Sequence, residues 1–405
     1  MFSAVMPTRH ALRAILSALK QFPNADVLYG DEWLVDADRH TVDLIAKPAF
    51  DPLLAARGAL FGNACLFHTR CFQNGEFPDL LKVASWPSSR VVHLPFPLVD
   101  TNTIRVPSSK QSDARRSDAP KISIVIPSRN GFDLVNKCLT TLFEKTDYQN
   151  YEVIVVDNGS DDQRVMELYE RCEKLHDNFR VLKQPGKFNF AALVNAGASL
   201  VDGHICLLNN DIEISRTNWL SKMVDTLQSK VCRVGVVGAK LLYPSRDIQH
   251  IGVAVGMNET ADHPHKGASE LSGYIGQMCL AERSTTAVTA AAMLIRKDCW
   301  QELSGFDAER FAVTYNDVDF CLRSRRAGWV VAMNGEAELI HHESASRGGK
   351  VSDERALQNR LERQRFQDVW KTQAFNDPFL SPHHSIYSRE ARLKTPSQFP
   401  EARVP

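Results

Sequence analysis

Strands and helices alternate along the middle of this 405-residue chain, and this alternation restricts the fold more than any other feature. The runs ISIVIP at 122–127 and YEVIVVD at 151–157 are almost entirely apolar, and a segment with helical spacing follows each. FRVLKQ at 179–184 and HICLLNND at 204–211 continue the series. Continuous apolar runs are typical of strands buried on both faces of a parallel sheet, joined by right-handed helical crossovers. The sequence therefore predicts an α/β fold with a mostly parallel central sheet.

The second half of the chain is less regular. Apolar runs predict strands at 234–243, 248–256 and 287–296, and two short strands at 329–333 and 337–342. Helices are expected at 316–327, with Asn316 as its capping residue, and at 354–370. The polar stretch PSSKQSDARRSDAP at 107–120 has the composition of an exposed linker. We therefore predict an N-terminal unit at 1–105, a linker at 106–120, a main domain at 121–350 and a tail at 351–405.

Composition excludes several classes of protein. The 48 Lys and Arg residues balance 48 Asp and Glu residues, whereas a nucleic-acid-binding domain has a basic excess. No run approaches the ~20 apolar residues that cross a bilayer, and the N-terminal stretch lacks a small-residue cleavage site. The nine cysteines include no C-x-x-C pair, which favours a reduced compartment over zinc or disulfides. We expect a cytoplasmic protein without a nucleic-acid partner or a transmembrane segment.

Polar clusters follow three of the predicted strands, at 127–130, 157–160 and 209–211. Ligands bind at the carboxyl ends of strands in open α/β sheets, so the clusters predict one shared crevice. The alternative is that these residue types simply form turns. PSRNGF after the first strand contains neither G-x-G-x-x-G nor a Walker loop, which argues against dinucleotide binding and P-loop phosphoryl transfer.

An ordered series of motifs spans 121–348: PSRN, VVDNGS, KFNFAALVNAGA, LLNND, VGAKLLYPSRDIQHIGVAVG, YNDVDFCLRSRRAGW and ELIHHESASRG. The series resembles glycosyltransferase family 2, in the branch that builds bacterial surface polysaccharides. The resemblance implies a Rossmann-like GT-A fold and an inverting reaction. It also implies a UDP- or dTDP-sugar donor, a glycan or lipid-linked saccharide acceptor, and Mg²⁺ or Mn²⁺ as cofactor. A lipid-linked acceptor would place the protein peripherally at the inner face of the cell membrane.

The same resemblance assigns a nucleotide site. Asp157 would accept a hydrogen bond from the pyrimidine ring, since an ionised carboxylate only accepts. For Lys187 a solvated lysine remains the alternative, and for Asn195 a satisfied buried amide. The nucleotide-binding residues implied are Pro127, Ser128, Arg129, Asn130, Asp157, Lys187, Asn195, Asn209 and Asn210.

Asp211 ends the segment that stands where the family carries its Asp-x-Asp metal motif. Asn209 replaces the first aspartate, so Asp211 alone offers a charged oxygen there. Mg²⁺ typically binds one or two carboxylates together with substrate phosphates. The resemblance adds His341 and His342 as metal ligands, of which His341 is preferred because neighbours on a strand point to opposite faces. It also implies that Ser346 and Arg347 close over the phosphates.

Direct displacement at a sugar carbon requires a base within reach of the acceptor hydroxyl. The resemblance assigns this role to Asp317, with Asn316 beside the acceptor where the family more often has glutamate. Asp319 could compete, but on a helix it would point about 200° away from Asp317. The alternative for both is that they complement the helix dipole. His263–His265 is interpreted as a loop over the acceptor.

Residues 1–105 resemble the back half of a second domain of the same kind, through DVLYGDEWLVD and KPAFDPLLAARG. We expect this partial GT-A-like unit to be a non-catalytic appendage. The main hypothesis is therefore an inverting glycosyltransferase. The second hypothesis is a catalytically degenerate glycan-binding or scaffold subunit, suggested by Asn209 and Asn316. A sugar nucleotidyltransferase is a third, although its glycine-rich basic loop is missing. The oligomeric state, the sugar and the linkage are not readable from the sequence.

Overall fold

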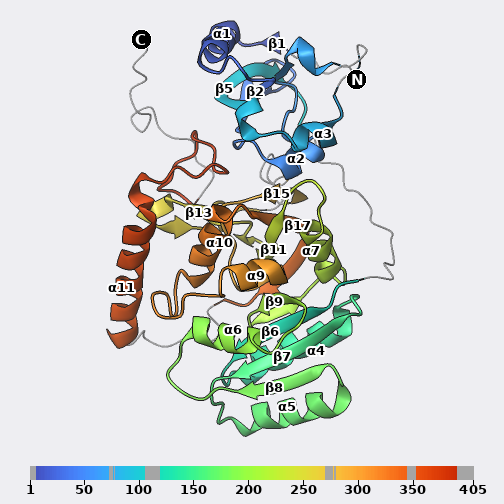
Figure 1. Cartoon of the computed structure of the whole chain (residues 1–405), viewed down its shortest axis with the longest axis vertical. Helices are drawn as coiled ribbons and strands as arrows, with labels where there is room; N and C mark the ends of the chain where they lie inside the picture. Colours follow the sequence, from blue (N-terminus) through green and yellow to red (C-terminus); the bar gives the residue numbers. More distant parts are fainter. Residues whose placement is uncertain are drawn as a thin grey trace.

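The computed structural model describes residues 6–72, 76, 78–104, 119–269, 277, 280–343 and 353–389. One ten-stranded sheet forms the centre, in the order β10-β17-β11-β16-β9-β6-β7-β8, with β12 on β11 and β15 on β17 (Figure 1). Its strands are β6 (Ile122–Ser128), β7 (Tyr151–Asp157), β8 (Phe179–Lys183), β9 (His204–Leu208), β10 (Ile212–Ile214), β11 (Val234–Leu242), β12 (Ile248–His250), β15 (Glu282–Ser284), β16 (Ala292–Ile295) and β17 (Val330–His341).

The sheet has a parallel half and a mixed half. Strands β9, β6, β7 and β8 are all parallel neighbours. Strand β16 then runs antiparallel to both β9 and β11, while β11 is parallel to β17. The predicted α/β class is confirmed, with the parallel strands on one side of the sheet.

Helices cover both faces because the buried strands alternate side chains between two cores. Ile122, Ile124 and Ile126 of β6 face one core, and Val125 faces the other. The first core receives α4 (Phe132–Lys145), α5 (Gln163–Leu175) and α7 (Trp219–Leu227). The second receives α6 (Phe190–Ala198), α9 (Lys297–Glu302), α10 (Asn316–Arg326) and α11 (Asp353–Trp370).

Four local predictions from the sequence are wrong. The strand expected at 248–256 is divided into β12 and β13 (Ala254–Val255), because Gly252 takes a φ of 118° between them; β13 pairs with β14 (Ala261–Asp262). The two short strands expected at 329–342 are one strand, β17, and the strand expected at 287–296 is regular only over β16. Asn316 does not cap α10: Tyr315, with a φ of 61°, is the capping residue, and Asn316 is the first helical residue.

The N-terminal unit has its own sheet, in the order β1-β5-β2-β3, with β4 on β2. Its elements are β1 (Met6–Pro7), α1 (Ala11–Gln21), β2 (Val27–Val35), β3 (Thr41–Ile45), α2 (Pro52–Ala56), β4 (Cys65–Phe67), α3 (Leu80–Ala84) and β5 (Val91–Thr101). Strand β2 is parallel to β5 and antiparallel to β3 and β4. In the main sheet β11 has the same arrangement, because it is parallel to β17 and antiparallel to β12 and β16. The unit thus repeats the mixed half of the main sheet, and residues 6–104, where described, contain no counterpart of β6 to β8.

Buried polar contacts join the N-terminal unit to the main domain. Asp51, at the start of α2, accepts hydrogen bonds from the backbone N and the Oγ of Ser284 in β15, at 2.8 and 2.7 Å. The segment after α11 adds a second connection, because Ala49 N donates to Pro378 O at 2.8 Å. His383 Nε2 lies 3.0 Å from Asp31 Oδ2. The C-terminal segment therefore runs beside the N-terminal unit, as Figure 1 shows.

We expect Asp51→Ala to lower the free energy of unfolding by about 1–3 kcal/mol, because it leaves buried donors of Ser284 and of α2 without an acceptor. Urea unfolding of the full chain measures the change. Asp38→Ala, at an exposed turn, is the control and should change it by less than about 0.5 kcal/mol. Equal effects of the two substitutions would contradict this account of the interface.

Candidate active site

A cavity of about 380 Å³ opens where the parallel half of the sheet meets the mixed half. Its walls come from the strand ends of β6, β9, β12 and β17, from α6, and from the segment before β16. The lining residues are Pro127, Ser128, Arg129, Phe188, Phe190, Leu193, Asn209, Asn210, Asp211, Gln249, His250, His263, Lys266, Thr289, Ala291, Val313, His341, Glu343 and Arg355.

Seven of the residues predicted from the sequence line this cavity together. The three polar clusters meet directly, because Asn210 Nδ2 donates to Ser128 Oγ at 3.0 Å and Asn158 N donates to Ser128 O at 2.9 Å. Asn209 N donates to Ala291 O at 2.9 Å, which fixes the loop after β9 to the segment before β16. The seven are Pro127, Ser128, Arg129, Asn209, Asn210, Asp211 and His341.

Asp211 and His341 form the centre of the cavity wall. His341 Nε2 lies 3.0 Å from Asp211 Oδ1, and both side chains are about nine-tenths buried. The pairing of β10 with the end of β17, in which Ile212 lies opposite His341, brings the two residues together. A carboxylate and an imidazole thus face one cavity although 130 positions separate them.

Gln249 orients the imidazole of His341. Gln249 Oε1 lies 2.6 Å from His341 Nδ1, and an amide oxygen can only accept, so Nδ1 carries a proton. Nε2 then faces the Asp211 carboxylate. A second partner that fixes the tautomer in this way is typical of histidines that bind metals. In the described part of the chain, no three His, Cys, Asp or Glu side chains are grouped to hold a metal, so substrate oxygens would have to complete a coordination sphere.

His342 points to the other face of the strand. Its Nε2 lies 2.8 Å from Glu213 Oε2, and it does not share the cavity wall formed by the described residues. This orientation separates the two candidate ligands, as neighbours on a strand require. Ser346 and Arg347, the residues expected over the phosphates, lie outside the described residues.

Four predicted nucleotide-binding residues are not among the described residues that line the cavity. Asp157 accepts from the backbone N of Ser160, and Asn130 Oδ1 accepts from the backbone N of Asp161 at 2.9 Å. Asn195 Nδ2 donates to Phe306 O at 2.9 Å, and Asn195 Oδ1 accepts from Phe306 N at 3.0 Å. Lys187 pairs with Glu354 at 2.8 Å on the exposed surface. All four side chains make contacts within the protein, and their roles toward a nucleotide stay predictions.

Asp317 lies behind the cavity wall. Its Oδ2 accepts from Ala290 N at 3.0 Å, and Ala290 is flanked by the lining residues Thr289 and Ala291. Burial raises the pKa of Asp317, although the hydrogen bonds it accepts oppose this effect. The carboxylate predicted to be the base is therefore attached to the same segment that holds Asn209. Asn316, the first residue of α10, is 2% exposed and is not among the described residues that line the cavity.

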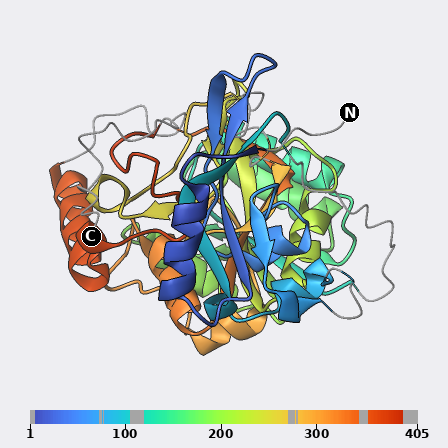
Figure 2. The ribbon, with the colours of Figure 1, turned by 90° about the horizontal axis from the view of Figure 1, so that it is seen from above.

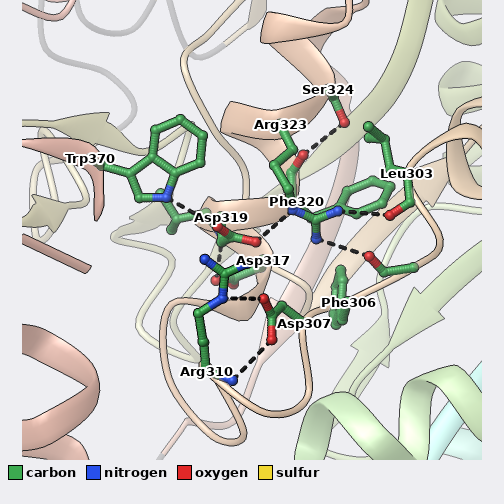
Figure 3. Close-up of polar contacts among 12 residues, drawn as sticks. Leu303, Phe306, Asp307, Arg310, Asp317, Asp319, Phe320, Arg323, Ser324 and Trp370 are labelled. Atoms are coloured by element: carbon green, nitrogen blue, oxygen red, sulfur yellow. Dashed lines mark hydrogen bonds and ion pairs between the residues drawn. The ribbon is translucent and has the colours of Figure 1, made fainter. Parts of the chain in front are cut away.

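Asp319 has a different environment. Its Oδ2 accepts from Arg323 Nε at 2.7 Å and its Oδ1 from Trp370 Nε1 at 3.0 Å, as Figure 3 shows. Arg323 also donates to the carbonyls of Leu303 and Gly305, both at 2.9 Å. Asp319 therefore joins α10 to α11, and its carboxylate is engaged in structural contacts.

Sequence reasoning did not name six polar residues of the cavity: Gln249, His250, Lys266, Thr289, Glu343 and Arg355. His263, from the segment interpreted as a loop over the acceptor, also lines the cavity. His250 Nδ1 lies 2.9 Å from His263 Nδ1. Burial and the charge of Lys266 lower the pKa of His263 to about 4, so its imidazole is neutral at neutral pH. Burial alone would raise the pKa of Glu343, but Lys266, at 3.2 Å, brings it below its usual value. Two sequence signals could have indicated such residues: Gln249-His250 within the apolar run IQHIG, and Glu343 within HHESASRG.

Residues 123–301 match the family model described as Glycosyl transferase family 2. Over these residues the chain is similar to family 2 glycosyltransferases. This match covers the parallel half of the sheet, the Asp211 segment and β16. It agrees with the resemblance carried by the sequence motifs.

Similar sequences occur in longer proteins. The "Uncharacterized protein y4gI" of Sinorhizobium fredii (strain NBRC 101917 / NGR234) is 36% identical over 279 residues, which are 68% of this chain and 30% of that protein. The "O-antigen biosynthesis protein RfbC" of Myxococcus xanthus is 29% identical over 445 residues, 95% of this chain and 33% of RfbC. The chain thus spans about a third of the length of these curated relatives.

Among solved structures, the chain is similar to the "Mannosyltransferase PcManGT from Pyrobaculum calidifontis in complex with GDP-Man and Mn2+". The TM-score is 0.42 at 14% identity, and the similarity covers 62% of this chain and 70% of the other.

Because Asp319 is buried among its partners, we expect Asp319→Ala to lower the free energy of unfolding by about 3–5 kcal/mol, as the loss of one partner of a buried ion pair does. Thermal or urea unfolding would show the change. Asp307→Ala removes a similar pair with the exposed Arg310 and should cost less than about 1 kcal/mol. A stable Asp319→Ala variant that has lost only catalysis would instead indicate that Asp319 is the base.

Proposed function

We propose that the protein is an inverting glycosyltransferase that moves a sugar from a UDP- or dTDP-sugar to a hydroxyl group of a polysaccharide or lipid-linked glycan. The observation that carries the proposal is the cavity in which Asp211 and His341 meet the strand-end residues of β6 and β9. Ser128, Arg129 and Asn210 offer hydrogen-bond donors there, as a diphosphate and a ribose require. Lys266 and Arg355 add positive charge to the same walls.

The donor set fits a divalent cation such as Mg²⁺ or Mn²⁺. Asp211 supplies a hard oxygen and His341 a nitrogen whose tautomer Gln249 fixes. Such an ion, when bound, neutralises charge on the leaving diphosphate. Asp211 and His341 are the residues that would hold it.

Asp317 is the proposed general base. A carboxylate whose pKa is raised by burial is a better proton acceptor than an exposed one. Its contact with Ala290 fixes it next to the cavity wall at Thr289. Transfer would deliver the acceptor proton to Asp317 as the oxygen attacks the sugar carbon and the nucleoside diphosphate leaves.

The name of RfbC refers to O-antigen biosynthesis, and a surface-polysaccharide acceptor for this chain is proposed from that name and from the motif series. We place the reaction in the cytoplasm, at the inner face of the cell membrane. No described helix is both long and apolar enough to span a bilayer.

The scaffold hypothesis makes a different prediction for the same cavity. It is favoured by Asn209, which replaces the first aspartate of the metal motif. A scaffold subunit would show no binding of nucleotide that depends on a metal, whereas the enzyme would bind and hydrolyse a nucleotide sugar.

We expect Asp211→Asn to weaken Mn²⁺-dependent UDP or dTDP binding at least tenfold, because it removes the charged oxygen from the cavity. Isothermal titration with and without EDTA measures the effect. Glu213→Gln is the matched control, since Glu213 pairs with His342 on the other face of the strand. Tight nucleotide binding that neither EDTA nor Asp211→Asn weakens would contradict the metal site.

Asp317→Asn should lower kcat for transfer by about 10²–10⁴-fold, because it removes the proton acceptor. Nucleotide affinity should change little. The measurement compares product formation from a nucleotide-sugar panel with UDP and dTDP titrations, and Asp307→Asn serves as the control. Loss of nucleotide binding in Asp317→Asn would show that the assigned role is wrong.

A further inference from the structure

Helix α1 exposes an apolar stripe on the surface of the N-terminal unit. Leu12, Leu16 and Leu19 are 69%, 52% and 43% exposed. Successive helical residues turn by about 100°, so these three side chains fall within an arc of about 60°. The other side of α1 packs against the unit through Ile15 and through alanines, of which Ala11 and Ala18 are buried. Figure 2, viewed from above, shows α1 in dark blue on the near side of the unit.

The corresponding helix of the main domain buries the same pattern. Helix α7 precedes β11 as α1 precedes β2, and Leu220, Val224 and Leu227 repeat the spacing of the α1 leucines. All three are at most 3% exposed. Large apolar residues at this spacing are typical of a face that another surface covers.

The charge around the stripe indicates what kind of surface this is. Residues 1–25 contain Arg9, Arg13 and Lys20 but no aspartate or glutamate. The three basic side chains are exposed, and no ion pair joins them to a described acidic residue. On a helical wheel with Ala11 at 0°, the leucine stripe lies at about 80–140°. Arg13 and Lys20 lie directly beside it, at about 200° and 180°. A basic border on an apolar stripe complements a surface with negative charge above an apolar interior.

We propose that α1 binds the surface of a membrane that contains anionic phospholipid, with its axis in the membrane plane. The leucines enter the boundary between headgroups and acyl chains, and Arg13 and Lys20 contact headgroup phosphates. The site rests on the proposed function in one respect: a lipid-linked acceptor would be at the same surface. A protein partner is the other possible occupant, and the absence of any acidic residue in the segment favours the lipid.

The test is sedimentation of the full chain with vesicles of phosphatidylcholine containing phosphatidylglycerol, and with vesicles of phosphatidylcholine alone. We expect binding to the anionic vesicles that weakens with added salt. The triple variant Leu12→Ser, Leu16→Ser, Leu19→Ser should lower the partition coefficient at least tenfold, and so should Arg13→Gln with Lys20→Gln. The control, Leu175→Ser, replaces a leucine that is 68% exposed on α5 and should bind as the native chain does.

Native-like binding by the triple variant, with a native unfolding midpoint, would overturn the proposal. Failure of the native chain to bind anionic vesicles would also overturn it. If light scattering then showed a dimer of the native chain that the triple variant does not form, the occupant of the stripe would be a protein. UDP and dTDP titration in solution separates the two proposals. Vesicle binding without nucleotide binding would contradict the proposed function alone. Nucleotide binding without vesicle binding would contradict the membrane site alone.

Discussion

The contact between Asp211 and His341 depends on the pairing of β10 with β17, and this contact forms part of the cavity wall. Strand β10 pairs with the end of β17, and His342 N donates to Asp211 O at 3.0 Å. This pairing ties the end of the parallel half to the last strand of the mixed half. Apart from this pairing, β16 and β11 separate the strand that leads to Asp211, β9, from β17, which carries His341. The fold therefore creates the pair from residues far apart in the sequence.

The parallel half was predictable because its inner strands β6, β7 and β9 are buried on both faces. Ile122 to Ile126 in β6 and Val153 to Val156 in β7 are fully buried, and such runs cannot be confused with amphipathic strands. The polar residues after β6 and β9 were predictable for a related reason, since parallel strands end at one edge. Asp211 and His341 were reached through the family resemblance, and the structure brings them together.

The rest of the site depends on contacts that no local pattern encodes. Asn195 has the position of a buried amide in an apolar helix, and only the fold shows that Phe306 takes both of its hydrogen-bonding groups. His263 and Lys266 reach the cavity from a segment without regular periodicity. Gly252 divides the predicted strand at 248–256, which a periodicity argument cannot detect because the apolar residues continue on both sides. The roles of Asp317, Lys187 and Asp157 toward substrate remain predictions.

The C-terminal segment has a double mechanical role. Arg355 of α11 lines the cavity, and Glu362 accepts from Thr314 Oγ1 at 2.8 Å, next to the lining residue Val313. Farther along, Asp377 accepts from Val255 N at 2.8 Å and His383 contacts Asp31 of the N-terminal unit. One continuous stretch of chain is thus both a wall of the cavity and a clamp on the appendage. Cleavage by a protease between α11 and His383 would release the clamp while leaving the wall attached, so limited digestion can separate the two roles in a single sample.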